Sequence, residues 1–232
     1  MPADAACNLN GSGTLSWLLR FDTVAGTLQT GGAKPSMAPS GPYAFVDQML
    51  TQGSTTFHIQ PVTAPAPLSA TCAFGASLGD LVFPMYLDAA ATQVVLLPLR
   101  ALRFHDAAMS ADQGCIGRFD AAGLDPANGC APDSTHPLFL DGGALDAFMT
   151  LEQTDTVVIA SLNETLCVTL SGNASMYGTK NASGLTVCKR DASNKIIYPG
   201  DWCAATNAAA SPTCSDAVEL QASFAAQAVT IQ

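Results

Sequence analysis

The stretch "DLVFPMYLDAAATQVVLLPLRALRF" (80–104) contains the longest apolar run of this 232-residue chain. The segments 80–88 and 93–104 are rich in Val, Leu and Phe, which favour half-buried strands. Pro98, Arg100 and Arg103 interrupt the second segment. It therefore falls short of the ~18 uncharged apolar residues that a bilayer span requires. The stretch predicts two strands of a folded core and argues against a membrane span.

Similar apolar–polar alternation occurs along the rest of the chain, with Gly, Pro, Asn or Asp between the runs. Strands are predicted at 13–23, 55–62, 155–162, 165–172, 184–190 and 217–224. The Pro-rich segment 61–70 is typical of a loop or an edge strand, because Pro cannot donate to a central ladder. One helix is expected over 141–155, where Leu145, Phe148 and Met149 recur at helical spacing.

Many short strands and few helices are typical of an antiparallel β-sandwich or jelly roll. We therefore expect a mainly β fold with one or two short helices, fastened by disulfides. No segment has the composition of an obligatory linker, so the sequence predicts a single β-rich domain over residues 1–232.

Eight cysteines, an even number without any CxxC pair, favour disulfides over zinc ligation. Pairing sequence neighbours gives Cys7–Cys72, Cys115–Cys130, Cys167–Cys188 and Cys203–Cys214. Four disulfides indicate an oxidising location, which is extracellular, periplasmic or at the cell surface. An alternative for "DAAC" (4–7) is lipidation of Cys7, which would leave one other cysteine without a partner.

The net charge of −10 disfavours nucleic acid as a partner, because both molecules would be anionic. The acids are concentrated between Asp106 and Asp155. This segment contains nine of the nineteen acidic residues and only one basic residue, Arg118. Four of the nine basic residues lie between Lys180 and Lys195. These regions could pair within one chain or remain solvated, and self-association between copies is a further alternative.

The loop "CIGRFDAAGLDPANGCAPDS" (115–134) suggests a calcium site, because calcium prefers carboxylate and carbonyl oxygens. The candidate ligands are Asp120, Asp125, Asn128 and Asp133. The loop does not match the EF-hand pattern. Asp is also a common turn residue, so a solvated acidic loop explains the same residues.

Three other patterns suggest chemistry. "GASLG" (75–79) matches G-x-S-x-G with Ser77 as nucleophile and His105 or His136 as base, although a hairpin turn explains it as well. A carboxylate pair such as Asp120 with Asp133 could supply an acid and a base. A copper site would combine histidine, thiolate and methionine ligands; the candidates are His58, His105, His136, Cys130 and Met149.

The aromatic residues Tyr198 and Trp202 in "IIYPGDWC" (196–203) are compatible with stacking on a sugar ring or with packing over a disulfide. Taken together, the sequence favours a secreted or cell-surface binding or structural protein of unknown ligand, with calcium as its candidate cofactor. The alternative is an extracellular hydrolase with a site assembled across loops, built from Ser77 and a histidine or from a carboxylate pair.

Overall fold

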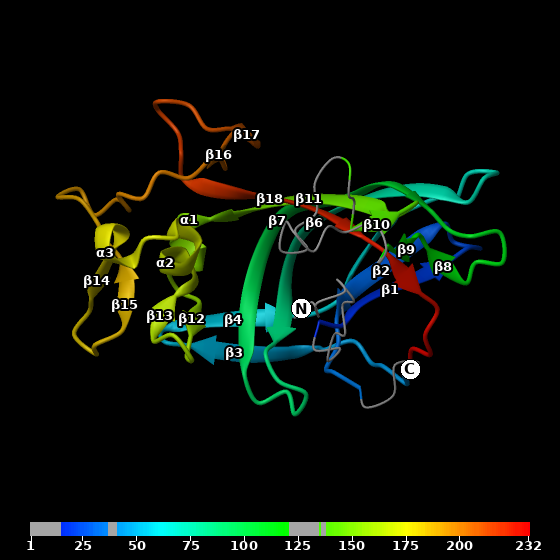
Figure 1. Cartoon of the computed structure of the whole chain (residues 1–232), viewed down its shortest axis with the longest axis horizontal. Helices are drawn as coiled ribbons and strands as arrows, with labels where there is room; N and C mark the ends of the chain where they lie inside the picture. Colours follow the sequence, from blue (N-terminus) through cyan, green and yellow to red (C-terminus); the bar gives the residue numbers. More distant parts are fainter. Residues whose placement is uncertain (1–14, 37–40, 121–134, 136–137) are drawn as a thin grey trace.

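The fold is a mainly β, disulfide-stapled sandwich in which nearly all strand pairs are antiparallel (Figure 1). It is taken from a computed structural model that describes residues 15–36, 41–120, 135 and 138–232. The principal sheet has six strands in the order β17 (Ala208–Ala209), β16 (Trp202–Cys203), β18 (Ala217–Phe224), β11 (Gly143–Thr150), β7 (Val94–Ala108) and β6 (Ala73–Tyr86).

Smaller sheets pack against the principal sheet or extend from its ends. One contains β1 (Trp17–Asp22), β2 (Thr27–Gly32) and β5 (Val62–Pro65), and another pairs β3 (Gln48–Gln52) with β4 (Thr55–Ile59). Short pairs join β9 (Arg118–Phe119) to β10 (Phe139–Leu140) and β8 (Cys115–Ile116) to β19 (Ala226–Gln227). The last sheet has the order β12 (Val158–Ile159), β13 (Glu164–Thr165), β15 (Thr186–Cys188), β14 (Gly178–Lys180).

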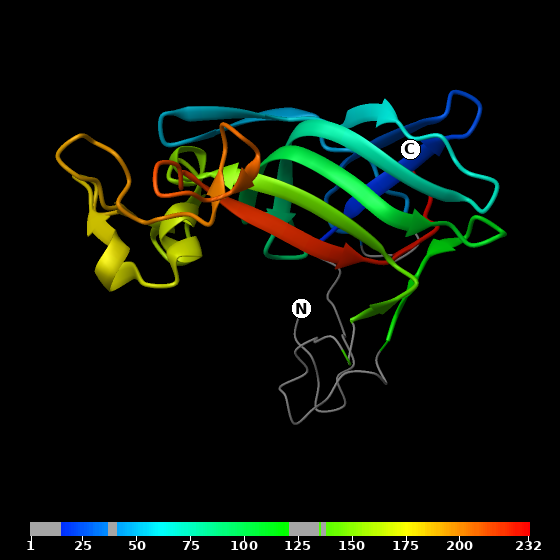
Figure 2. The same cartoon turned by 90° about the horizontal axis from the view of Figure 1, so that it is seen from above.

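The stretch 80–104 forms most of the longest hairpin, β6–β7, as its strand propensity predicts. Phe83, Leu96 and Leu102 have no exposed surface, and the indole of Trp17 stacks on Phe83 at 4.3 Å between ring centroids. The long strands curve toward the smaller sheets (Figure 2), and β6 contacts β2, β4 and β5. The core therefore lies between the principal sheet and these smaller sheets.

Proline has no backbone N–H to donate to a neighbouring strand. Both prolines of the hairpin lie at positions that do not pair with a third strand. Pro84 is on β6, the edge strand of the principal sheet. Pro98 precedes Arg100, the first residue of β7 that pairs with β11. The predicted edge-strand character of 61–70 is also confirmed, because β5 lies at the edge of its sheet.

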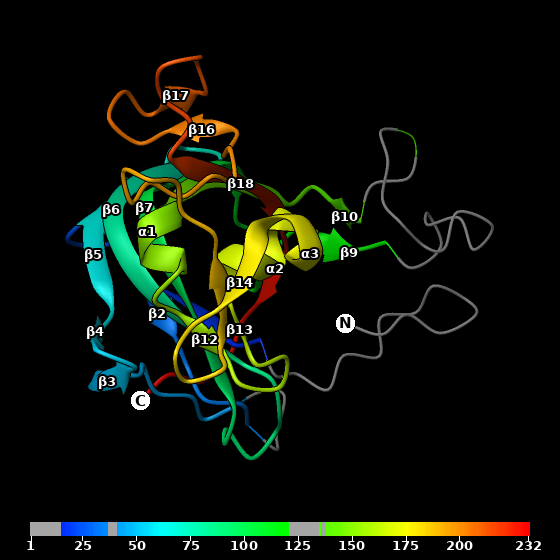
Figure 3. The same cartoon turned by 90° about the vertical axis from the view of Figure 1, so that its left-hand side faces the viewer.

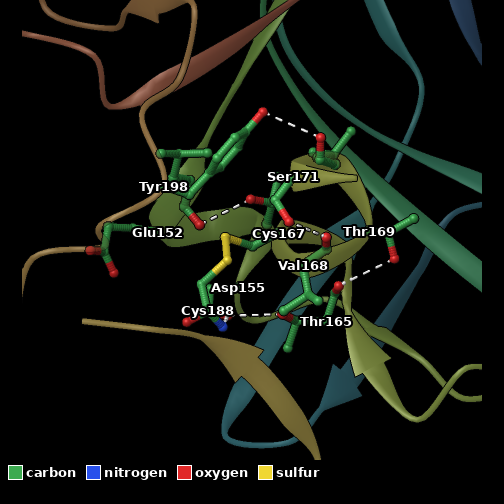
Figure 4. Close-up of a disulfide and its surroundings, with 12 residues drawn as sticks. Glu152, Asp155, Thr165, Cys167, Val168, Thr169, Ser171, Cys188 and Tyr198 are labelled. Atoms are coloured by element: carbon green, nitrogen blue, oxygen red, sulfur yellow. Dashed lines mark hydrogen bonds between the residues drawn. A yellow bond between two sulfur atoms is a disulfide. The ribbon is translucent and has the colours of Figure 1, made fainter. Parts of the chain in front are cut away.

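A second, smaller apolar cluster surrounds the Cys167–Cys188 disulfide (Figure 4). Three short helices of the described chain lie in this part of the molecule: α1 (Leu151–Thr154), α2 (Leu166–Ser171) and α3 (Ala174–Tyr177). The carboxylate of Asp155 accepts hydrogen bonds from Thr165 Oγ1 at 2.9 Å and from the Cys188 amide at 2.7 Å. It also pairs with Arg190 at 3.0 Å, so one buried carboxylate joins three segments.

Several predicted elements differ from the structure. The helix expected over 141–155 is strand β11 followed by the single turn α1, because pairing with β7 and β18 on both sides outweighs the local helical spacing. Conversely, most of the predicted strand 165–172 is helix α2, which ends at Gly172 with φ of +64°. "GASLG" is not a hairpin turn but lies within β6, where register shifts accommodate its glycines.

Two of the predicted disulfides are confirmed, Cys167–Cys188 and Cys203–Cys214. Cys72 and Cys115 are free thiols, so the predicted bridges Cys7–Cys72 and Cys115–Cys130 are not found. Their proposed partners, Cys7 and Cys130, lie outside the described residues. Both cysteines lie beside the residues that follow β7. The Cys72 carbonyl accepts a hydrogen bond from the Met109 amide, and the Cys115 carbonyl accepts one from the Ser110 amide. Predicting disulfides between cysteines that are neighbours in the sequence cannot take account of these backbone contacts.

Within the described ranges, the helices have between four and six residues, and none is long and apolar enough to cross a membrane.

Replacing Asp155 with alanine should lower the free energy of unfolding by about 2–4 kcal/mol. The change removes a carboxylate whose side chain is only 7% exposed and strands the donors that it satisfies. Chemical denaturation measures the loss. The control is Asp47→Ala, which breaks the exposed pair with His58 and should cost less than about 1 kcal/mol. Equal losses in the two variants would contradict the role assigned to Asp155.

Candidate functional site

Four polar residues form one continuous row across the principal sheet. The register pairs Ser77 with Arg103, Arg103 with Asp146, and Asp146 with Gln221. These residues come from β6, β7, β11 and β18 in that spatial order. Residues far apart in the sequence therefore lie side by side because antiparallel pairing places them opposite one another.

Side-chain alternation explains why this row faces outward. Arg103 lies between Leu102 and Phe104, which are 0% and 2% exposed and belong to the core. Asp146 similarly follows the buried Leu145. Because successive strand residues point to opposite faces, the polar residues reach the solvent side of the sheet. Register shifts lie close to the row in both β6 and β11, and such bulges change the direction in which side chains point.

The outward face is hollowed into a cleft of about 570 Å³ above this row. Trp202 of β16, Asn207 and Glu219 also line the cleft, together with Gly79, Ala101, Leu102 and Ala147. The segment that carries Trp202 and Asn207 projects beyond the sheet near the start of β18 (Figure 3). The Cys203–Cys214 disulfide closes residues 203–214, which include Asn207 and directly follow Trp202, into a loop that we call the 203–214 loop.

The lining side chains are held by hydrogen bonds. The indole Nε1 of Trp202 donates to Asn207 Oδ1 at 3.1 Å. The side-chain Nε2 of Gln221 donates to Glu219 Oε1 at 2.9 Å, and the backbone N–H of Glu219 donates to Asp201 Oδ1 at 2.8 Å. Preorganised polar groups of this kind lose little conformational entropy when a ligand binds.

Beside the row, the His105 imidazole lies between two carboxylates. Its Nδ1 is 2.6 Å from Asp106 Oδ2, and its Nε2 is 3.1 Å from Asp146 Oδ2. The Nε2 atom is buried, and the second contact is an ion pair without the geometry of a directed hydrogen bond. The Asp146 carboxylate also pairs with the Arg103 guanidinium.

These contacts shift the protonation of both partners. The hydrogen bond to Asp106, and then the nearby Asp146 carboxylate, raise the pKa of His105 above its usual value. The neighbouring Arg103 guanidinium, followed by His105, lowers the pKa of Asp146. Asp146 is therefore an ionised acceptor at neutral pH rather than a proton donor.

The predicted hydrolase residues are close in the sheet but are not assembled into a triad. Ser77 lines the cleft, opposite Arg103, and His105 is two residues farther along β7. Within the described ranges no hydrogen bond joins Ser77 to His105, whose ring nitrogens both face carboxylates. A serine nucleophile requires a base within hydrogen-bond reach, which this arrangement does not supply. The other candidate base, His136, lies outside the described residues.

Of the predicted calcium ligands, Asp120 directly follows β9, whereas Asp125, Asn128 and Asp133 lie outside the described residues. The calcium site and the Asp120–Asp133 pair therefore stay predictions. Two groups of described residues have ligand-like spacing: Asp155 with Cys167 and Cys188, and Asp216 with Cys203 and Cys214. All four sulfur atoms are in disulfides, so they are not thiolate ligands.

The candidate copper ligands within the described ranges are separately engaged. His58 pairs with Asp47 on an exposed surface, His105 lies between its two carboxylates, and Met149 is a core residue with 4% exposure. No group of metal ligands among the described residues combines the two histidines. The remaining candidates, Cys130 and His136, lie outside those ranges.

The basic and acidic regions meet within one chain through Arg190. Its guanidinium pairs with Glu152 at 2.8 Å and with Asp155 at 3.0 Å. The two aromatic candidates have separate roles. Tyr198 packs against the disulfide cluster and donates to the Leu170 carbonyl at 3.2 Å, whereas Trp202 lines the cleft.

Sequence patterns indicated Ser77, His105 and Trp202 as candidate site residues, but they did not indicate Arg103, Asn207, Glu219 or Gln221. Glu219 and Gln221 are the polar positions of the alternating strand 217–224, so the sequence pattern predicts that they lie on its solvent face. Asn207 had no such signal. Comparison with protein-family models, curated proteins and solved structures finds no significant match for this chain.

The raised pKa of His105 makes part of the stability pH-dependent. Protonated His105 stabilises the folded state in full below its unfolded pKa of 6.5, and this contribution is lost as the pH rises through the folded pKa. The difference in unfolding free energy between the wild type and His105→Gln should therefore shrink across that range. Denaturation at a series of pH values measures this difference.

Asp146→Asn should lower the pKa of His105, because it removes a carboxylate that favours the imidazolium. NMR titration of the His105 ring protons reports the midpoint in both proteins. An unchanged midpoint would show that Asp146 does not act on the imidazole.

Proposed function

We propose that this protein is an extracytoplasmic binding module whose cleft, above the Ser77–Gln221 row, binds a polyhydroxylated ligand of the saccharide class. The observation that carries the proposal is one aromatic residue, Trp202, beside a fixed set of carboxylate and amide groups in a cleft of about 570 Å³. This volume lies in the range of small-molecule binding sites.

The lining suits hydroxyl groups and apolar C–H faces together. The side chains of Asp146, Glu219 and Asn207 offer acceptor oxygens, and Arg103 and Gln221 offer N–H donors. A sugar hydroxyl both donates and accepts hydrogen bonds, so it can use both kinds of group. Because Asn207 already engages the indole N–H, Trp202 contributes its ring face, against which the C–H face of a sugar can pack.

The ionised state of Asp146 suits a binding role better than that of a proton donor. Cleavage of a glycosidic bond requires one carboxylic acid that donates a proton, and its pKa is typically raised. Asp146 has a lowered pKa, because Arg103 and His105 stabilise its ionised form. The two disulfides support a location in an oxidising compartment, where extracellular saccharides are found.

Trp202→Ala should weaken binding of an oligosaccharide identified by glycan-array screening by at least about 10-fold, measured by calorimetry. The matched control is Tyr177→Ala, an aromatic truncation outside the cleft, which should leave the affinity unchanged. The chain has only two tryptophans, and Trp17 packs in the core. The fluorescence change on ligand addition should therefore disappear in Trp202→Phe. Full binding by Trp202→Ala would contradict the proposed site.

A further inference from the structure

The cations beside the cleft are already neutralised by acids of the same sheet. Arg103 is the basic residue of the lining, and its guanidinium pairs with Asp146. His105 lies between Asp146 and Asp106. An anionic ligand group would have to displace one of these carboxylates, so the cleft offers it no ready partner.

Glu219 is the contrasting case. Its side chain accepts a hydrogen bond from the neutral amide of Gln221, and no described ion pair involves it. The neighbouring segment carries two more acids, Asp201 and Asp216, and no basic residue between positions 196 and 232. No described ion pair includes Asp201, Asp216 or Glu219, whereas the Arg103 guanidinium of the lining pairs with Asp146. The negative potential at this end of the cleft therefore favours a positively charged group.

The sheet register places Trp202 close to Glu219. Trp202 pairs with Ala217, and Glu219 is two residues farther along β18 on the same face. Diagonal neighbours of this kind lie roughly 7–8 Å apart, and their Cβ atoms are somewhat closer. An ammonium group placed between them lies within reach of both the carboxylate and the indole ring, and a cation within ~6 Å of such a ring is attracted to its π face.

We propose that the cleft selects saccharides that carry a free amino group, with the ammonium held between the Glu219 carboxylate and the Trp202 ring. This selectivity rests on the proposed function, because it uses the same cleft. Asp146, Asn207 and Gln221 then contact the hydroxyl groups of the sugar, and the Glu219 carboxylate provides the preference for the charged form over its neutral, N-acylated counterpart.

The test uses two hexasaccharides of β-1,4-linked units, one of glucosamine and the other fully N-acetylated. They are titrated into the whole protein by calorimetry at mildly acidic pH, where the amino groups are protonated. The amino form should bind about 10-fold more tightly, and this preference should weaken with added salt because it depends on charge. In Glu219→Gln the preference should fall to about 2-fold or less, with the affinity for the N-acetylated form preserved.

Glu164→Gln is the matched control, since Glu164 also accepts one side-chain hydrogen bond, from Thr169, and its loss changes the net charge equally. It should retain the full preference. Equal or tighter binding of the N-acetylated hexasaccharide would overturn the amine selectivity and leave the proposed function standing. A preference that survives in Glu219→Gln would overturn the role of Glu219. Binding of neither hexasaccharide would overturn the amine selectivity, whereas binding of a different saccharide from the array would still support the proposed function.

Discussion

The register between β6, β7 and β11 is the constraint on which the rest of the structure depends. A strand has a side-chain period of two, so a slip of one residue would exchange its core and solvent faces. The fully buried Leu102 and nearly buried Phe104 oppose such a slip in β7, because Arg103 would then enter the core. The same register that buries these residues places Arg103 opposite both Ser77 and Asp146. Core packing and the polar row thus have one cause.

The site is accordingly a product of pairing between distant strands, and this limits what the sequence could predict. The fold class followed from alternation and cysteine parity, and strand 217–224 was predicted with the bounds that β18 has. The helix predicted over 141–155 was wrong. Leu145 and Met149 fit both the helical and the strand period, and pairing with β7 and β18 is what makes this segment a strand. Local patterns cannot contain that information.

The charges of the acid-rich segment 106–155 also could not be interpreted from the sequence alone. Along the sequence, 106–155 has nine acids and one basic residue, which suggested a bound cation. In the structure, Asp146 faces Arg103 and His105, and Glu152 and Asp155 face Arg190. Three of these nine acids therefore pair with basic side chains from β7 or from the segment after β15, which a linear count of charges cannot show. The candidate calcium ligands between Asp120 and Asp133 are not among these three, so the calcium site stays a prediction.

The attachment of the 203–214 loop has a consequence for how this protein can diversify. The strand β16 at its base meets β18 through a single residue pair, Trp202 with Ala217, and a disulfide closes the loop independently of the main core. Substitutions within the loop therefore change one wall of the cleft at little cost to folding. Exchange of this loop would therefore reshape one wall of the cleft, while the sheet beneath it preserves the polar row.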